Sequence, residues 1–273
     1  MIAYPNIDPV FLKIGPLSFR WYGLMYAISF VLATFVMPII AARKKNKITQ
    51  EEISDLLFYT AFGVILGGRF GYILFYNLPF YLENPSKLLA VWEGGMSFHG
   101  GLLGVIIAGT FYCRTRKRSF YELADVSMIS VAMGLGFGRI GNFINGELFG
   151  RVTDVPWCMV FPEGGLVCRH PSQLYQFALE GVAISSILWF LSKKDLPKGS
   201  LFWSFILLYG LFRFLTEFVR EPDAHIGFIF QYFSMGQLLS LPMFVTGVVM
   251  LFVLRPKKKN QNSIARLETP RYS

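Results

Sequence analysis

The sequence has few charged residues, few cysteines and few histidines. Asp, Glu, Lys and Arg make up only 16% of its 273 residues, against 53% hydrophobic residues, which is too apolar for an ordinary soluble domain. Its 3 cysteines form no CxxC motif and no Cys/His spacing typical of a metal site, so we expect neither a metal nor a cofactor. No basic stretch leads into a short apolar core and a small-residue cleavage site, so we expect no cleaved signal peptide.

Long apolar runs dominate the sequence instead. They exceed the ~20 residues needed to cross the hydrocarbon core of a bilayer. The sequence therefore predicts an all-α integral membrane protein with seven transmembrane helices, built as a single membrane-embedded domain over residues 1–273. We expect an irregular or interfacial segment over residues 1–18 and an extracytoplasmic head loop over residues 143–171. The predicted spans are residues 19–41, 53–76, 97–113, 121–142, 172–192, 199–219 and 236–254.

The distribution of basic residues predicts the orientation. A net charge of +9 could indicate nucleic-acid binding. However, 17 of the 26 Lys and Arg fall on one side of the predicted membrane and 5 on the other. The positive-inside rule then places the N-terminus outside and the C-terminus, with its basic tail over residues 255–273, in the cytoplasm. We attribute the charge to topology and expect no nucleic-acid partner.

Residues 138–151 combine two arginines, two asparagines and a glutamate with glycines at the end of a long apolar run. An ionisable residue at the bilayer centre costs about 2.5 to 3.5 kcal/mol on insertion scales, so it usually faces a cavity or a partner. With the predicted topology, five helices bring polar or ionisable side chains to one level in the outer half of the membrane. These are Tyr22, Arg69, His99, Arg139 and Arg213.

Arg139 and Arg213 point to an anion-binding role. A guanidinium carries five donors and keeps its charge, which suits a phosphate better than lipid tails. Internal neutralisation is the alternative, because Tyr209, Arg213 and Glu217 recur one turn apart on one helix face, where Glu217 could pair with Arg213. We interpret both arginines as binding an anion directly.

Three further residues are open to two interpretations. Glycines flank His99 on both sides, so a ligand could approach closely, and imidazole can accept a proton near neutral pH; a lone histidine is more often structural. Arg69 either contributes to the site or is a structural partner for Glu180 or Asp125. Tyr76 either binds substrate or belongs to the interfacial aromatic belt.

The predicted head loop contains a β-hairpin over residues 157–161 and 166–168, with a glycine-containing turn. We expect Cys158 and Cys168 to be free buried thiols, with a disulfide across the hairpin as the alternative in an oxidising compartment. His170 lies beside Pro171 and a helix start, which favours a helix-entry capping role. We interpret His225 as an interfacial loop residue.

Together these stretches resemble the bacterial prolipoprotein diacylglyceryl transferase family. The matching segments recur in order across nearly the whole chain, and residues 138–151 are the most specific of them. The segments are residues 21–26, 67–69, 94–101, 138–151, 169–175, 209–223 and 234–237.

The resemblance implies transfer of the diacylglyceryl group of phosphatidylglycerol to the lipobox cysteine of prolipoprotein signal peptides, with release of glycerol phosphate. It implies membrane lipids as surroundings and an active site on the outer side of the bacterial cytoplasmic membrane. By motif position His99, Arg139 and Arg213 are catalytic candidates. The substrate-binding candidates are Tyr22, Arg69, Tyr76, Asn142, Asn145, Glu147, Gly150, Tyr209 and Glu217. A transporter and a non-catalytic scaffold for an anionic lipid are the alternatives.

Overall fold

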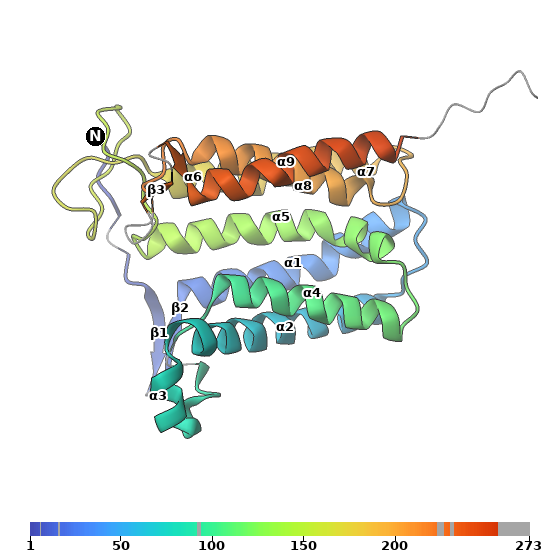
Figure 1. Cartoon of the computed structure of the whole chain (residues 1–273), viewed down its shortest axis with the longest axis horizontal. Helices are drawn as coiled ribbons and strands as arrows, with labels where there is room; N and C mark the ends of the chain where they lie inside the picture. Colours follow the sequence, from blue (N-terminus) through green and yellow to red (C-terminus); the bar gives the residue numbers. More distant parts are fainter. Residues whose placement is uncertain (6, 16, 92–93, 223–226, 230–231, 256–273) are drawn as a thin grey trace, which may run out of the picture.

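The computed structural model describes residues 1–255 except 6, 16, 92–93, 223–226 and 230–231. The predicted interfacial role of His225 and nearly all of the predicted basic tail lie outside the described residues. The chain forms a bundle of long helices (Figure 1). They are α1 (Trp21–Arg43), α2 (Gln50–Tyr76), α4 (Phe98–Thr115), α5 (Phe120–Ile144), the continuous stretch of α6 (Ser172–Gln176), η3 (Phe177–Ala183) and α7 (Ile184–Ser192), then α8 (Ser200–Thr216) and α9 (Met235–Val253).

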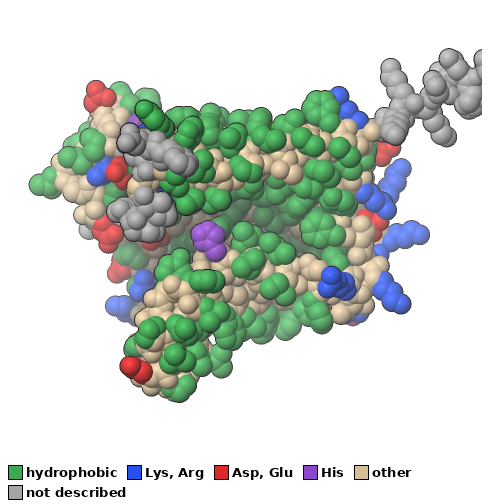
Figure 2. Space-filling model, viewed as in Figure 1, with side chains coloured by type: hydrophobic (Ala, Val, Ile, Leu, Met, Phe, Trp, Pro, Cys, Tyr) green, Lys and Arg blue, Asp and Glu red, His purple; other side chains and the backbone are tan. Residues whose placement is uncertain are grey.

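Helices coincide with every predicted span, so the apolar runs located them correctly. Within the described part of the chain, five helical stretches are long and apolar enough to cross a membrane: α1, α2, α5, residues 172–192 and α9. α8 is a shorter apolar helix. Large apolar side chains cover the outside of the bundle (Figure 2), as shown by Phe35, which is 65% exposed, and Ile107, which is 68% exposed. This composition defines an integral membrane protein, while the count of seven spans and the orientation remain predictions.

Helix α5 lies in the middle of the bundle. It packs against α1 on one side and against η3, α7 and α8 on the other, and α8 in turn packs against α9. α2 and α4 form a tightly packed pair at one side (Figure 1). Glycines make this close approach possible, because a Cβ on Gly63 would lie only 2.6 Å from the backbone oxygen of Gly104.

The loops predicted to be cytoplasmic meet at one end of the bundle. Lys44 Nζ donates to the Lys194 carbonyl at 2.9 Å, which links the segment after α1 to the segment after α7. Asp125 of α5 accepts hydrogen bonds from the backbone N–H groups of Gly199 at 2.7 Å and Phe202 at 2.9 Å, and thereby caps α8. The predicted grouping of these loops is therefore present.

Short elements occupy the opposite end. An antiparallel pair, β1 (Val10–Ile14) and β2 (Leu17–Arg20), precedes α1, so the segment predicted to be irregular or interfacial is regular in part. A short arm follows α2 and consists of α3 (Leu78–Glu83) and η1 (Pro85–Lys87). β3 (Phe228–Ile229) and β4 (Phe233–Ser234) form an antiparallel pair before α9.

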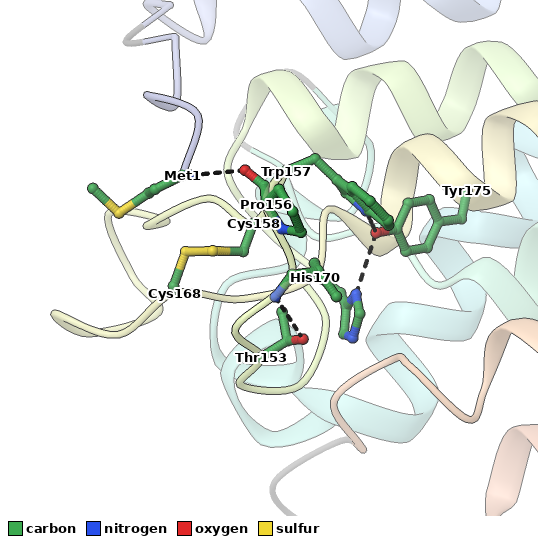
Figure 3. The surroundings of a disulfide bond; sticks show 9 residues. Met1, Thr153, Pro156, Trp157, Cys158, Cys168, His170 and Tyr175 are labelled. Carbon is green, nitrogen blue, oxygen red and sulfur yellow. Dashed lines mark hydrogen bonds between the residues drawn. A yellow bond between two sulfur atoms is a disulfide. The ribbon is translucent and has the colours of Figure 1, made fainter.

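The head loop lies between α5 and α6, as predicted, but two details of the prediction were wrong. Met159 and Arg169 exchange backbone hydrogen bonds of 2.9 and 2.8 Å, yet they form an isolated bridge rather than a strand pair. Cys158 and Cys168 form a disulfide instead of remaining free thiols (Figure 3). The Met159–Arg169 pairing explains this, because it brings the adjoining cysteines to a Cα–Cα distance of 5.5 Å.

Candidate active site

Two arginines from different helices converge on one buried glutamate. Arg139 of α5 approaches Oε2 of Glu180 with its Nε at 3.1 Å and its Nη2 at 3.0 Å. Arg213 of α8 places Nη1 3.9 Å from Oε1 of the same carboxylate. Glu180 is fully buried, while the two arginine side chains keep 16% and 14% of their surface exposed. The two arginine side chains are therefore partly accessible, whereas the carboxylate between them is not.

The local backbone brings Glu180 to this position. Glu180 lies in η3, a stretch of π-helix, a geometry that is rare and frequent at functional sites. Gly181 packs directly on Gly136 of α5, where a Cβ on Gly181 would lie 2.7 Å from the Gly136 Cα atom. This close contact allows Glu180 to reach Arg139 across the helix interface.

A second buried carboxylate, Glu217, lies just beyond α8. Its Oε1 pairs with Arg213 Nη2 at 2.6 Å and with Arg220 Nη1 at 3.2 Å. Its Oε2 accepts a hydrogen bond of 2.6 Å from Ser234, the residue that caps α9. The Arg213–Glu217 pairing that the sequence offered as an alternative is thus present. Within the described residues, it still leaves Arg213 Nη1 without a hydrogen-bond partner.

Two tyrosines border the arginines. Tyr209 lies one turn before Arg213 on α8 and interacts electrostatically with Arg139, Arg213 and Glu180. Tyr22, near the start of α1, lies within electrostatic range of Arg139 and Glu147. Gly141 makes room for Tyr22, because a Cβ there would lie 2.6 Å from the tyrosine ring. The structure therefore groups four of the predicted residues: Tyr22, Arg139, Tyr209 and Arg213.

The polar residues after Arg139 form a separate network at the base of the head loop. Asn142 and Asn145 donate to Oε1 of Glu147 at 2.8 and 3.2 Å. Gln173 of α6 donates to the Glu147 carbonyl at 2.6 Å. These bonds connect the end of α5 to the start of α6. The network thus fixes the loop beside the arginine pair.

Gly150 permits the head loop to cross the chain that follows α8. Its N–H donates to the His170 carbonyl at 2.8 Å. A Cβ at this position would lie 2.5 Å from the Val219 carbonyl oxygen and 2.6 Å from the His170 Cβ. A larger residue would force these segments apart.

His99 lies apart from the arginine pair. It is exposed in the first turn of α4, after the capping residue Ser97, and its ring contacts Phe98. It makes no hydrogen bond or ion pair to Arg139 or Arg213, all three being described residues. Its position leaves the imidazole accessible from outside the bundle.

Arg69 does not pair with Glu180 or Asp125, which was one of the two interpretations that the sequence left open. Its guanidinium is almost completely buried and donates to backbone carbonyls: to Leu88 at 2.9 Å, Gly94 at 2.5 Å and Lys87 at 2.6 Å, with a longer bond to Gly95. It therefore holds the arm after α2 and the glycine turn before α4. Tyr76 is 66% exposed and stacks on Tyr72, as expected of an interfacial aromatic residue.

His170 is bound into the head loop (Figure 3). Its Nδ1 lies 3.2 Å from the Tyr175 hydroxyl, which also accepts a 2.6 Å hydrogen bond from the Trp157 indole. The predicted capping role was wrong, because Pro171 is the capping position and no side chain caps α6. Burial lowers the pKa of His170, so the fold favours its neutral form.

Glu180 was not among the site residues predicted from the sequence. A glutamate within an apolar span was visible in the sequence, and the cost of such a residue signals a buried partner. What the sequence did not show was that this partner is Arg139. Gln176, four residues earlier, is also fully buried, and neither atom of its amide has a hydrogen-bond partner within the part of the chain described.

The fold and the site define a helical membrane protein whose interior holds two arginines against buried glutamates. The model of the prolipoprotein diacylglyceryl transferase family matches residues 9–253. The chain is 56% identical over 257 residues to a phosphatidylglycerol–prolipoprotein diacylglyceryl transferase of Geobacter sulfurreducens, covering 94% of this chain and 99% of the relative. It is 53% identical over 251 residues to the protein of that name from Aeromonas hydrophila, covering 92% of each. The chain belongs to the prolipoprotein diacylglyceryl transferase family.

Proposed function

We propose that this chain transfers the diacylglyceryl group of phosphatidylglycerol to the thiol of a lipobox cysteine in prolipoprotein signal peptides, the first step of lipoprotein maturation. The observation that carries the proposal is the buried Arg139–Glu180–Arg213–Glu217 chain in a member of this family. The names of the relatives support phosphatidylglycerol and prolipoprotein as the substrates.

The two arginines bind the phosphate of the lipid. Glu180 occupies Nε and Nη2 of Arg139, which leaves its Nη1 outside this ion pair, and Arg213 Nη1 has no hydrogen-bond partner among described residues. Negative charge develops on the phosphate as its bond to the glyceryl carbon breaks. Fixed cations aimed at developing charge in a low-dielectric site are among the largest contributions to catalysis.

The chemistry is a substitution at the glyceryl carbon next to the phosphate. The cysteine thiol loses its proton, the thiolate sulfur attacks this carbon, the C–O bond to phosphate breaks and a thioether forms. Glycerol phosphate leaves with the electron pair of the broken bond. Because the thiolate is the nucleophile, a base is required, and we assign this role to His99. Its exposed position at the start of α4 allows a peptide thiol to approach.

The remaining candidates position these groups. Tyr22 and Tyr209 border the phosphate site, Glu217 orients Arg213, and the network of Asn142, Asn145 and Glu147 holds the head loop beside it. We place the active site toward the outer leaflet of the bacterial cytoplasmic membrane, because the arginine pair lies near the end of the bundle opposite its basic loops.

The test uses purified protein, phosphatidylglycerol and a synthetic lipobox peptide. A transferase yields a thioether-linked diacylglyceryl peptide and one glycerol phosphate per peptide, and neither forms with a Cys-to-Ser peptide. A transporter moves lipid across a vesicle without cleaving it. A scaffold binds lipid and releases nothing. Product formation in the complete mixture supports the proposal, and its absence with folded protein contradicts it.

A further inference from the structure

A cavity of about 310 Å³ lies at the end of the bundle opposite the arginine pair. Its volume is within the range of about 300 to 1,000 Å³ typical of small-molecule sites. The loops that follow α1 and α7 and the start of α5 form its wall. Five cationic side chains line it: Lys44, Lys45, Lys47, Arg118 and Lys198. Lys and Arg side chains gather at this end in Figure 2.

The two acidic side chains of the wall already have partners. Asp125 accepts the backbone N–H groups of Gly199 and Phe202. Glu122 pairs with Lys198. Asp125 also interacts electrostatically with Lys44, so among the described lining residues Lys45 and Lys47 are the lysines that neither carboxylate balances.

Some of the cations are committed, but others are not. Arg118 forms a bidentate pair with Glu52, with distances of 2.8 and 2.6 Å. Lys44 donates to the Lys194 carbonyl, and burial lowers its pKa, an effect that the nearby carboxylates of Asp125 and Asp195 partly offset. Lys45 and Lys47 are exposed and make no ion pair in the described residues. Lys45 also has a positive φ of 50°, a conformation that usually selects glycine.

We infer that this cavity binds the phosphate group of an anionic ligand, at a site distinct from the one that carries Arg139 and Arg213. The ligand chemistry is a phosphate that three lysines share: Lys44 at the base and Lys45 and Lys47 at the rim. Two sources fit this chemistry. The cavity lies level with the ends of the helices, where phospholipid headgroups lie, and a free phosphorylated small molecule could also enter it.

Two double variants with equal charge change test the inference in the full-length protein. Lys45→Gln with Lys47→Gln removes the two lysines of the rim. Arg114→Gln with Lys117→Gln removes two exposed cations at the same end that do not line the cavity. Melting temperature shows that each variant is folded. Native mass spectrometry then counts the lipids retained from mixtures of phosphatidylglycerol and phosphatidylcholine, with and without inorganic phosphate.

We expect wild type and the Arg114/Lys117 variant to retain one more phosphatidylglycerol than the Lys45/Lys47 variant. The affinity of the Lys45/Lys47 variant for this lipid should fall roughly thirtyfold, because each lysine contributes about a fivefold effect on an anionic headgroup. If inorganic phosphate instead binds with the same dependence on Lys45 and Lys47, the source is a free phosphorylated molecule and the site stands. Equal losses in the two double variants, or no preference of wild type for phosphatidylglycerol over phosphatidylcholine together with no phosphate binding, overturn the inference.

Discussion

Glu180 and Arg213 face each other across 3.9 Å, and neither Oε1 of Glu180 nor Nη1 of Arg213 has a hydrogen-bond partner among the residues that the structure describes. The same carboxylate holds Arg139 at 3.0 Å. Arg213 Nη1 is itself buried, so a ligand oxygen can accept from it only by entering the interior beside Glu180, but no existing hydrogen bond of Nη1 has to break. The unpaired donor distinguishes this site from a closed internal ion pair.

Replacing Glu180 by glutamine should reduce both stability and activity. The amide keeps the shape of the side chain but removes the charge opposite Arg139, and breaking a buried ion pair commonly costs about 3 to 5 kcal/mol. Asp55→Asn is the matched control, because Asp55 pairs with the half-exposed Arg116, and surface pairs contribute about 0 to 1 kcal/mol. Thermal unfolding in detergent measures the stability of both variants. An equal loss of stability in the two would mean that Glu180 is not a buried counter-charge.

Arg69→Gln should release the arm after α2 while leaving the arginine pair intact. The variant loses most of the bonds to the carbonyls of Lys87, Leu88 and Gly94, so residues 84–91 should become accessible to limited proteolysis. We expect turnover to fall because this segment leads into the helix start that carries His99. If activity disappears while proteolysis matches wild type, Arg69 contacts substrate directly instead of positioning the arm.

His99→Gln should lose most activity while the protein still inserts into the membrane and binds phosphatidylglycerol. Glutamine keeps a hydrogen-bonding side chain of similar reach but cannot take a proton, and loss of a general base commonly costs about 10² to 10⁴-fold. Turnover with a lipobox peptide and lipid binding are measured separately. Near-normal turnover at neutral pH would make His99 structural and would favour a thiolate assisted by an arginine.

Reporter fusions test the orientation. Fusions after Lys45, Arg118, Lys194 and Arg255 should report cytoplasm, and fusions after Glu83, Asp154 and Asp223 the exterior, because 17 basic residues fall on one side and 5 on the other. Asp223 lies outside the described residues. One clear reversal among the interior loops would contradict the topology and the assignment of the site to the outer leaflet.

The sequence predicted the helices because burial in lipid requires long apolar runs, and these survive in any tertiary arrangement. The sequence also identified Arg139 and Arg213 as candidates, because a charge within an apolar run is costly in lipid unless it faces a partner or a ligand. It did not predict the partner of Arg139, because that contact depends on a π-helical turn and on the packing of Gly181 against Gly136. The sequence also did not predict the bonds of Arg69 to backbone carbonyls, because every residue has a carbonyl and the residue type does not show which one accepts.

The sequence offered the Cys158–Cys168 disulfide only as the alternative to free thiols, for a related reason. Residues 10 apart in an irregular loop carry no periodicity that fixes their distance, so only the folded head loop shows that their Cα atoms approach to 5.5 Å. The capping role predicted for His170 failed in the same way. Its contact with Tyr175 depends on the path of the whole loop.

We propose that Arg213 acts on the phosphate and does not merely neutralise Glu217. Arg213→Ala removes the 2.6 Å partner of Glu217 and leaves the carboxylate with Arg220 at 3.2 Å. If neutralising Glu217 were the only role of Arg213, the function lost in Arg213→Ala should return when Glu217→Gln removes the carboxylate. Lysine should not replace either Arg139 or Arg213 well, because an ammonium lacks the planar fork that holds two oxygens.

The most direct measurement is therefore glycerol phosphate release by the Arg213→Ala, Glu217→Gln double variant, in the presence of phosphatidylglycerol and a lipobox peptide. We predict that it stays inactive, since the leaving phosphate still lacks its cation. Recovery to about a tenth of the wild-type rate, a barrier difference of only about 1.4 kcal/mol, would contradict a direct role for Arg213.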